Sequence, residues 1–385
     1  MSSEGFSHAK KHLHEMHICT QCGYCRSVCP TFKEVLMEPE AARSRVILSW
    51  GLVQGEIEPD QSVIDALYHC TTCADCNRRC PSNVDVVSIM ESVRQDLYEM
   101  DAIPENHRDM ISSIEEYKNP ARQSAEARLD FVPDDIPDRT GGGDVLLYFG
   151  CGMGYTDMKM LTSTINSLEK LEVDYTFLGK DESCCGFPEL VMGKVHGMEE
   201  RARQNLTALE RLDPKPTKVV VTCAACYRAW AKYYKDMVGH DLEVFHIVQY
   251  YNELLRDGKL VFKKGLGKKI IYHDPCDIGR HMKIYDEPRN LLASIPDTEL
   301  VEFEKNREEA ACCGGGGGLK NVDYDLSITI AESRVRQAID REAQVIVTAC
   351  PTCKANLADA AHNIKKKDGI KVKVMDVVEL VNKLI

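Results

Sequence analysis

The sequence predicts an α+β multidomain chain, in which an α-helical N-terminal domain precedes two duplicated α/β domains. Two observations support this prediction: eighteen cysteines fall into regular groups along the 385 residues, and one sequence pattern occurs twice after residue 143. A chain of this length can hold two or three domains with separate cores, at roughly 100–200 residues per domain. We expect a helical domain at 1–118, a linker at 119–143, and the repeats at 144–267 and 268–385.

Composition and charge exclude several classes of protein. Hydrophobic residues make up 44% of the chain and charged residues 28%, as in ordinary globular proteins. The net charge of −12 argues against nucleic acid as a partner, because phosphate binding requires a basic surface. The N-terminal residues lack the apolar stretch of a secretory signal, and no apolar segment is long enough to span a bilayer. We therefore expect a cytoplasmic protein without direct membrane insertion, whose association with a membrane would come through a partner subunit.

The first eight cysteines form two runs with the spacing C-x2-C-x2-C-x3-C, each followed by a proline. In an intracellular chain, thiols clustered in this way indicate metal binding rather than disulfides. The spacing is that of two-cluster bacterial ferredoxins, in which the fourth cysteine of each run ligates the other cluster. Zinc sites use two separated C-x2-C pairs instead. We therefore predict two cubane [4Fe–4S] clusters, one held by Cys19, Cys22, Cys25 and Cys80, the other by Cys70, Cys73, Cys76 and Cys29.

Apolar residues at helical spacing occur between the two cysteine runs, over Glu38 to Leu52, and again over Val84 to Met100. The N-terminal domain is therefore expected to be a helical ferredoxin domain. Three arginines lie beside the cysteines, at Arg26, Arg78 and Arg79. They either tune reduction potentials or are solvated surface residues.

The segment from Asn119 to Gly143 has the composition of a linker, with three prolines, acidic residues and a triple glycine. After it, one pattern occurs twice. In each copy an aliphatic run leads to a cysteine, a Cys-Cys-Gly follows, and a second aliphatic run leads to a C-x2-C pair. Short β-branched runs that alternate with helical sequence predict parallel sheets, with the cysteines at the carboxyl ends of the strands. The five cysteines are Cys151, Cys184, Cys185, Cys223 and Cys226 in the first copy, and Cys276, Cys312, Cys313, Cys350 and Cys353 in the second.

These repeats resemble the CCG motif of heterodisulfide reductases, and a helical ferredoxin followed by two such repeats resembles the D-type subunit of that family. The resemblance implies one non-cubane [4Fe–4S] cluster for each complete motif, held by the five cysteines, which would also be the catalytic residues. It further implies an oxidoreductase that passes electrons through the cubanes to the non-cubane clusters and reduces a disulfide of the CoM–CoB type. One departure is Ala224, where the second copy has Pro351.

An alternative function stays open on the same motifs, namely an electron-relay subunit of a flavin-dependent organic-acid dehydrogenase. The chain has no flavin or nicotinamide signature of its own, so both functions require a redox partner, either a flavoprotein or a membrane cytochrome b. We expect a hetero-oligomeric complex in either case.

Two glycine-rich segments, Gly150 to Gly154 and Gly314 to Gly318, do not complete a dinucleotide-binding or phosphate-loop motif. We expect them to let the backbone approach a bulky cluster.

Several polar residues surround the first cysteine of the second repeat. His273, Asp274 and His281 either supply protons or binding contacts, or are structural. Arg280 and Lys283 either attract an anionic thiol substrate or are ordinary surface residues.

Overall fold

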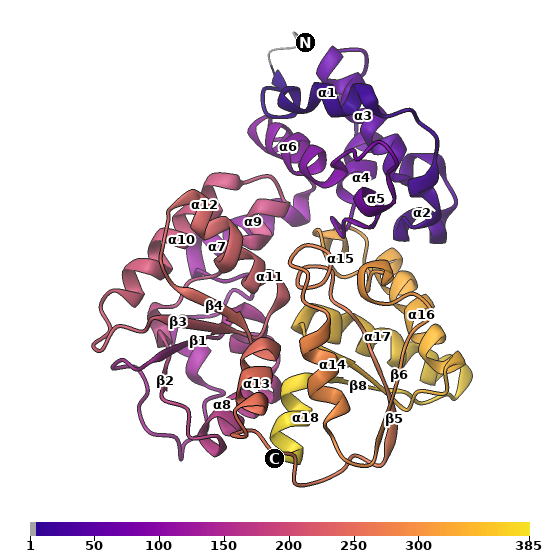
Figure 1. Cartoon of the computed structure of the whole chain (residues 1–385). Helices are drawn as coiled ribbons and strands as arrows, with labels where there is room; N and C mark the ends of the chain where they lie inside the picture. The colour runs from indigo at the N-terminus through magenta and orange to yellow at the C-terminus, as the bar shows by residue number, and fades with distance from the viewer. Residues whose placement is uncertain (1–4) are drawn as a thin grey trace.

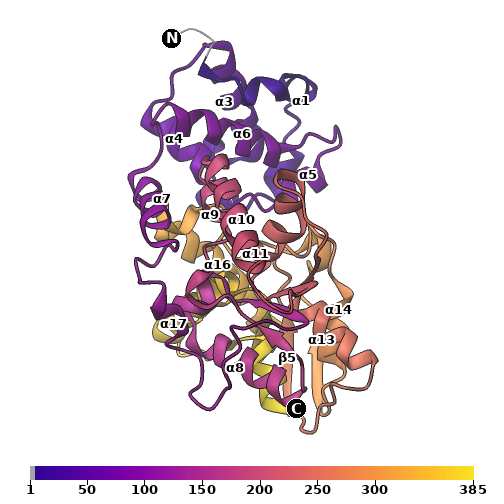
Figure 2. The ribbon, with the colours of Figure 1, turned by 90° about the vertical axis from the view of Figure 1, so that its left-hand side faces the viewer.

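The computed structural model describes residues 5–385 and places a helical module above two α/β modules that lie side by side (Figure 1). Residues 1–4 of the predicted first domain lie outside the described residues. Figure 2 shows the same arrangement from the side, with the helical module at one end of the molecule and the C-terminus at the other. This architecture confirms the predicted fold class of a helical domain followed by two α/β domains.

The helical module has α-helices and short helical turns but no strand within the described residues up to Tyr117. Its elements are η2 (Ala9–His12), α1 (Leu13–Ile18), η3 (Tyr24–Ser27), α2 (Pro30–Val35), η4 (Glu38–Glu40), α3 (Ala42–Gln54), α4 (Gln61–Tyr68), α5 (Asp75–Arg79), α6 (Val86–Glu99) and α7 (Glu105–Tyr117).

The two helices predicted from apolar spacing are present as α3 and α6. The first predicted helix is divided, because Pro39 lies in the short turn η4 and the α-helix itself begins at Ala42. Helix α6 begins where the carboxylate of Asp85 accepts a hydrogen bond from the amide of Ser88. Its apolar face is buried, as the spacing predicted; that face comprises Val86, Ile89, Met90, Val93 and Leu97.

Each repeat contains a four-stranded sheet in which every pair of neighbouring strands is parallel. The first sheet has the order β2-β1-β3-β4 and the second the equivalent order β6-β5-β7-β8. The strands are β1 (Val145–Tyr148), β2 (Tyr175–Thr176), β3 (Lys218–Val221) and β4 (Glu243–His246), then β5 (Lys268–Tyr272), β6 (Thr298–Val301), β7 (Val345–Thr348) and β8 (Lys373–Asp376). The identical order confirms that the second half of the chain is a duplication.

Helices connect these strands. In the first repeat they are η6 (Gly152–Thr156), α8 (Met158–Lys170), η7 (Gly179–Asp181), α9 (Phe187–Val191), α10 (Val195–Leu209), α11 (Ala224–Arg228), η8 (Ala229–Tyr234), α12 (Lys235–Met237) and α13 (Ile247–Arg256). In the second they are α14 (Asp286–Ala293), η9 (Arg307–Glu309), α15 (Leu319–Val322), α16 (Tyr324–Asp340), α17 (Pro351–Asp368) and α18 (Val377–Leu384).

The two repeats pack through a reciprocal exchange of helices. Helix α13 of the first repeat packs on α14 of the second, and α18 of the second packs on α8 of the first (Figure 1). The equivalence extends to the first turns of α13 and α18, where His246 and Asp376 each accept a hydrogen bond from the backbone and complete a capping box. The repeats are therefore related by a pseudo-twofold arrangement that brings their strand ends toward each other.

The predicted linker packs on the first repeat and contains the turn η5 (Glu126–Leu129). Arg128 in this turn is fully buried and forms an ion pair with Glu182 at 2.5 Å. The guanidinium of Arg139 binds the carboxylate of Glu169. The exact domain boundaries stay a prediction; β1 begins at Val145 and β5 at Lys268.

The described residues contain no helix that is long and apolar enough to cross a membrane.

Candidate iron–sulfur sites

The second cysteine run and the last cysteine of the first run lie together in the helical module. Cys29, Cys70, Cys73 and Cys76 line one small cavity. Arg45, on α3, is buried beside them and donates a hydrogen bond to the Cys29 sulfur at 3.5 Å. The structure therefore brings together the four thiols predicted to hold one cubane, including the one contributed by the other run.

The first cysteine run is less buried than the second. Cys22 is exposed, whereas Cys19 and Cys25 are half-buried. Burial raises the pKa of the Cys25 thiol to about 11. The turn η3, which contains Cys25, packs against α5, and Cys80 follows directly after that helix and accepts a hydrogen bond from the amide of Val84 at 3.4 Å. Packing of α5 on η3 thus carries Cys80 toward the run to which it was assigned.

The five cysteines of the first repeat form a continuous series of sulfur contacts. Their thiols hydrogen-bond in the order Cys151, Cys184, Cys185, Cys226 and Cys223. Hydrogen bonds from the Cys184 and Cys226 thiols lower the pKa of Cys185 to about 6. A thiol with this pKa is largely ionised at neutral pH, which is the form that binds metal.

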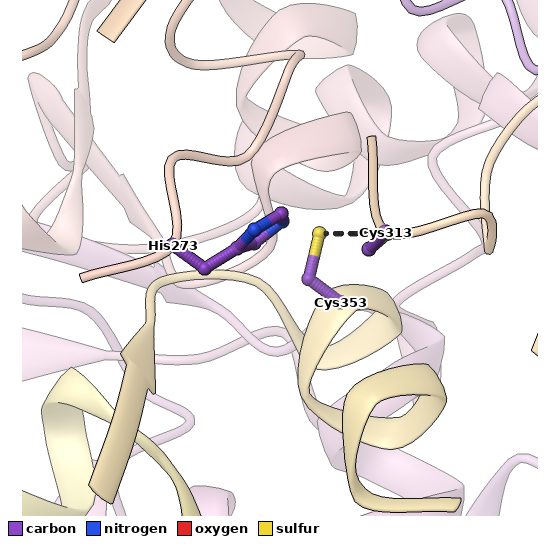
Figure 3. A group of neighbouring side chains, drawn as sticks. All are labelled: His273, Cys313 and Cys353. Carbon is purple, nitrogen blue, oxygen red and sulfur yellow. Dashed lines mark hydrogen bonds between the residues drawn. The ribbon is translucent and has the colours of Figure 1, made fainter. Parts of the chain in front are cut away.

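The second repeat reproduces this series. Its thiols hydrogen-bond in the order Cys276, Cys312, Cys313, Cys353 and Cys350. The sulfurs of Cys313 and Cys353 lie 3.2 Å apart, and Figure 3 shows Cys353 in the first turn of α17 with the ring of His273 beside its sulfur. Hydrogen bonds from the Cys312 and Cys353 thiols hold the pKa of Cys313 well below its ordinary value. The second cysteine of the adjacent pair therefore has the same electrostatic character in both repeats.

The two sulfur series meet at one contact, a hydrogen bond between the thiols of Cys223 and Cys350. Each residue lies two positions after the end of its strand, β3 or β7, so the contact joins equivalent positions of the two repeats. A cavity of about 350 Å³ opens beside it. Nine of the ten repeat cysteines line this cavity: Cys151, Cys184, Cys185, Cys223, Cys226, Cys276, Cys313, Cys350 and Cys353.

The remaining repeat cysteine, Cys312, points to the helical module. Its thiol hydrogen-bonds to the thiol of Cys73, and this contact helps to raise the pKa of Cys73 well above its ordinary value. The second repeat therefore touches the cysteine group of Cys29, Cys70, Cys73 and Cys76. Sulfur contacts run without interruption from the helical module through the second repeat to the first.

These thiols fit the iron–sulfur clusters that the motifs imply. All eighteen cysteines are free, and each group consists of sulfur donors, the ligands of such clusters. Gly150 supports the fit, because it has φ +65 and a Cβ there would lie 2.9 Å from the Cys226 sulfur. A side chain at position 150 would thus enter the space around the first sulfur series.

The second glycine-rich segment also packs closely on the helical module. A Cβ on Gly317 would lie 2.4 Å from the carbonyl oxygen of Cys70, and one on Gly318 would lie 2.6 Å from the ring of His107. These glycines therefore let the second repeat approach the backbone of the helical module, in addition to bordering the cavity.

The histidines and the aspartate near Cys276 have structural partners; His273 and Asp274 are buried, and His281 is half-buried. Asp274 forms an ion pair with Arg289 at 2.7 Å. His281 interacts through Nε2 with the carbonyl oxygen of Thr72 at 2.9 Å, which ties the second repeat to the helical module. His273 lies with the sulfurs of Cys313 and Cys353 in a compact group (Figure 3).

The interpretation of Arg280 as a surface residue is wrong. Its side chain is buried, and its Nε donates a hydrogen bond to the carbonyl oxygen of Cys73 at 2.6 Å. A free cation that attracts substrate from solvent is excluded at this position, because the guanidinium is held by backbone carbonyls at the junction of two modules.

Sequence reasoning missed a second buried arginine, Arg94 on α6. Its guanidinium donates to Cys70 in its own module at 2.7 Å, to Val191 in the first repeat at 2.8 Å and to Gly317 in the second at 2.9 Å, in each case to a carbonyl oxygen. One side chain therefore joins all three modules. The sequence offered one indication that Arg94 is buried: it directly follows Val93, which belongs to the apolar face of α6.

Comparison with known families agrees with this geometry. Residues 15–84 match the 4Fe-4S dicluster domain, and residues 145–229 and 270–358 match the CCG cysteine-rich domain. The chain is thus an iron–sulfur oxidoreductase subunit. The D-type subunit of the dihydromethanophenazine:CoB–CoM heterodisulfide reductase of Methanosarcina mazei is 34% identical, over 96% of this chain and 94% of that protein. The corresponding subunit of Methanosarcina acetivorans is 35% identical over the same shares. The chain belongs to the family of D-type subunits of heterodisulfide reductase.

A more distant relative bears a different name. The EtfAB:quinone oxidoreductase of Syntrophomonas wolfei is 26% identical, over 96% of this chain and 58% of that protein. Among solved structures, a hypothetical protein from Helicobacter pylori superposes with a TM-score of 0.62 at 10% identity, covering 100% of this chain and 73% of that one. This last likeness shows the fold alone.

Proposed function

We propose that this chain is the disulfide-reducing subunit of an oxidoreductase complex and holds two cubane and two non-cubane [4Fe–4S] clusters. The matching sulfur series of the two repeats support the proposal most strongly, because they meet at Cys223 and Cys350 beside one cavity. Reduction of a disulfide takes two electrons and two protons and releases two thiols, whereas an iron–sulfur cluster supplies one electron at a time. Two equivalent groups of ligands at one cavity provide for both electrons.

The proposed ligands follow the groups described above. One cubane takes Cys19, Cys22, Cys25 and Cys80, and the other takes Cys29, Cys70, Cys73 and Cys76. The non-cubane clusters take the five cysteines of each repeat, which are also the proposed catalytic residues: Cys151, Cys184, Cys185, Cys223 and Cys226, and Cys276, Cys312, Cys313, Cys350 and Cys353.

The cavity wall suits a disulfide that must be kept from water. Met110, Phe187 and Met192 contribute apolar surface beside the cysteines. The two charged residues of the wall are paired, Asp277 with Arg228 at 3.3 Å and Lys320 with Asp359 at 2.8 Å. An S–S bond held here is shielded from solvent, and side reactions with water are suppressed.

The substrate and the partner are proposed by relationship. The Methanosarcina relatives are named for the CoB–CoM heterodisulfide, and we propose a disulfide of this type as the substrate of the present chain. Those relatives are subunits, so we propose a hetero-oligomeric complex with a flavoprotein or a membrane cytochrome b as redox partner. The chain would be cytoplasmic, or held at the membrane by that partner.

Thiol release tests the function directly. Anaerobically purified, cluster-loaded protein is reduced, mixed with the CoM–CoB heterodisulfide, and assayed for two thiols per disulfide. We expect turnover in the natural chain and none in Cys185→Ala or Cys313→Ala, because each substitution removes a ligand from one of the two sites. The paramagnetic signals of the cubanes serve as the control and should persist in both variants. Failure of the natural chain to release thiols would contradict the proposal.

The relative named as a quinone oxidoreductase favours a second candidate, in which the chain is an electron-relay subunit, such as that of a flavin-dependent organic-acid dehydrogenase. Under this function the natural chain releases no thiols. A co-purifying flavoprotein should instead reduce all four proposed clusters when it is given its organic acid. The identity of the co-purifying polypeptide therefore distinguishes the two candidates.

A further inference from the structure

Cys22 is the only one of the eighteen cysteines, all within the described residues, that is exposed to solvent. The other members of its proposed group are half-buried, eight of the ten repeat cysteines are buried, and Cys151 and Cys276 are half-buried. Electron transfer between proteins weakens steeply with distance, so an electron enters or leaves most readily where a ligand reaches the surface. The loop of Cys22 is that place.

Exposed apolar side chains gather around this loop. Of the nine most exposed large apolar residues in the described chain, four fall within residues 24–47. They are Tyr24 at 57% exposure, Leu36 at 73%, Met37 at 61% and Ile47 at 39%. Ile47 lines a shallow hollow together with Cys19 and Gln21, which places it beside the same loop. Such a concentration of apolar surface marks an interaction site rather than a random distribution.

Arginines outnumber carboxylates among the side chains of this surface, although the chain as a whole carries −12. Arg26 and Arg43 both pair with the single carboxylate of Glu38, which directly follows Met37. Arg43 also holds the Cys22 loop, because it donates to the carbonyl oxygen of Gln21 at 3.0 Å.

A third arginine lies at this surface. Arg79 is exposed, and its guanidinium lies over the ring of Tyr24, 5.4 Å from the ring centre. We define the quartet face by the residues Cys22, Tyr24, Arg26, Leu36, Met37, Glu38, Arg43, Ile47 and Arg79. Apart from Cys22, which belongs to the proposed cluster, the charged side chains of this face are three guanidiniums and one carboxylate.

We propose that the quartet face is the docking surface for a small acidic one-electron carrier protein, with the apolar residues at the centre of the contact and the arginines at its rim. This inference rests on the proposed function only in that the chain carries clusters and needs a redox partner. The exchange moves one electron at each encounter: the reduced carrier loses one electron, the chain gains one, and no proton or bond changes place. Complementary charge at the rim raises the association rate, and a partner of opposite sign is selected.

The test uses cluster-loaded chain and a plant-type [2Fe–2S] ferredoxin as the acidic carrier. Stopped-flow absorbance gives the rate constant of reduction by this ferredoxin, and binding of the oxidised ferredoxin gives a dissociation constant without turnover. We expect Arg79→Glu and Met37→Asp each to lower the rate constant and the affinity by about tenfold at low salt. The effect of Arg79→Glu should fade as salt is raised, because screening weakens rim charges.

Matched controls lie on the first repeat. Arg203→Glu makes the same charge change at an exposed position of α10, and Met158→Asp makes the same apolar-to-acidic change on α8. Neither should alter reduction by ferredoxin, and reduction by methyl viologen, which needs no docking surface, should be equal in all variants. Equal ferredoxin rates in Arg79→Glu, Met37→Asp and the natural chain would overturn the proposal. The natural chain could instead fail to release thiols while Arg79→Glu and Met37→Asp still slow its reduction by ferredoxin. That result would overturn the proposed function but support the docking surface.

Discussion

Arg280 of the second repeat donates a hydrogen bond from Nε to the carbonyl oxygen of Cys73 in the helical module, at 2.6 Å. A second hydrogen bond joins the guanidinium to the carbonyl oxygen of Ala310 in its own repeat. The buried charge lies beside the thiols of Cys73, Cys276 and Cys312, which belong to two different proposed clusters. The charge of Arg280 therefore acts on thiols of both the helical module and the second repeat, where the two modules meet.

Replacement of Arg280 should change reduction potentials at this junction. A buried positive charge favours the reduced, more negative form of a nearby cluster, and its effect is large where water is excluded. In Arg280→Gln we expect the midpoint potentials of the cluster at Cys73 and of the second-repeat cluster to become more negative. Redox titration followed by paramagnetic resonance measures this shift.

The first repeat provides the internal control for Arg280→Gln. Its cysteine Cys151 has a different cation beside it, Arg128, which comes from the segment before β1. The first-repeat signal should therefore keep its potential, and Arg280→Lys, which keeps the charge, should shift the other two signals less. Equal shifts of all signals would show a general structural effect and contradict the assignment.

A side chain at position 150 should block one cluster site. Gly150→Ala places a methyl group 2.9 Å from the Cys226 sulfur, on a residue whose backbone φ is +65°. We expect the variant to bind about four fewer iron atoms per chain than the natural protein, which should hold about sixteen if all sites carry four. Iron analysis of anaerobically purified protein measures the loss.

Gly239→Ala is the matched control for this change. Gly239 has φ +72, close to that of Gly150, but a Cβ there meets no atom within 4 Å. The two substitutions therefore share the backbone cost and differ in the contact with sulfur. An iron content that falls equally in both variants would contradict the steric explanation.

Much of this architecture was predictable because local sequence determines it. The aliphatic runs before Cys223 and Cys350 became β3 and β7, since β-branched residues buried on both faces favour parallel strands. The spacing of the cysteine runs identified the candidate ligands along the chain. The helix between the two cysteine runs was also predictable from the spacing of its apolar residues. Its start was not, because Pro39 lies in the turn η4 and α3 begins only at Ala42.

Contacts between modules were not predictable. Arg280 is a polar residue in a loop, and it is buried by a partner 207 residues away in the sequence. Gly317 and Gly318 looked like part of a cluster loop, although their small size is also required by Cys70 and His107. No pattern in a single sequence reveals which backbone will lie against a loop, so these roles required the tertiary structure.

His107 should make stability depend on pH. It is buried on α7, its Nε2 interacts with the carbonyl oxygen of Gly318 at 3.0 Å, and burial lowers its pKa from 6.5 to about 4. The folded protein therefore keeps the ring neutral, whereas the unfolded chain protonates it below pH 6.5. This contribution to stability is complete above pH 6.5 and is lost as pH falls toward 4, by about 3 kcal/mol.

Thermal unfolding of the cluster-loaded protein under anaerobic conditions measures this contribution. Between pH 6.5 and 4 the unfolding temperature of the natural chain should fall more steeply than that of His107→Gln, which cannot bind the proton. His14→Gln, at an exposed position, should follow the natural chain. Parallel curves for His107→Gln and the natural chain would contradict the assignment.

The last prediction concerns the exchange of ligands between the two cysteine runs. Cys29 belongs to the first run in sequence, but it lines the cavity of Cys70, Cys73 and Cys76. Its sulfur also accepts a hydrogen bond from Arg45, whose charge lies beside Cys70 as well. Cys29→Ser should therefore damage the cubane of the second run and spare the one built on the first.

Cys80→Ser should have the opposite effect, because Cys80 follows α5 and that helix packs on the turn that carries Cys25. Each variant should lose about four iron atoms, so iron content alone does not separate them. The two proposed cubanes differ in exposure, since Cys22 is exposed, whereas Cys29, Cys73 and Cys76 are buried and Cys70 is half-buried. A soluble relaxation agent should broaden the paramagnetic signal that remains in Cys29→Ser more than the one that remains in Cys80→Ser. The reverse result would mean that each run keeps its own fourth cysteine, and the geometry around Cys29 would then need another explanation.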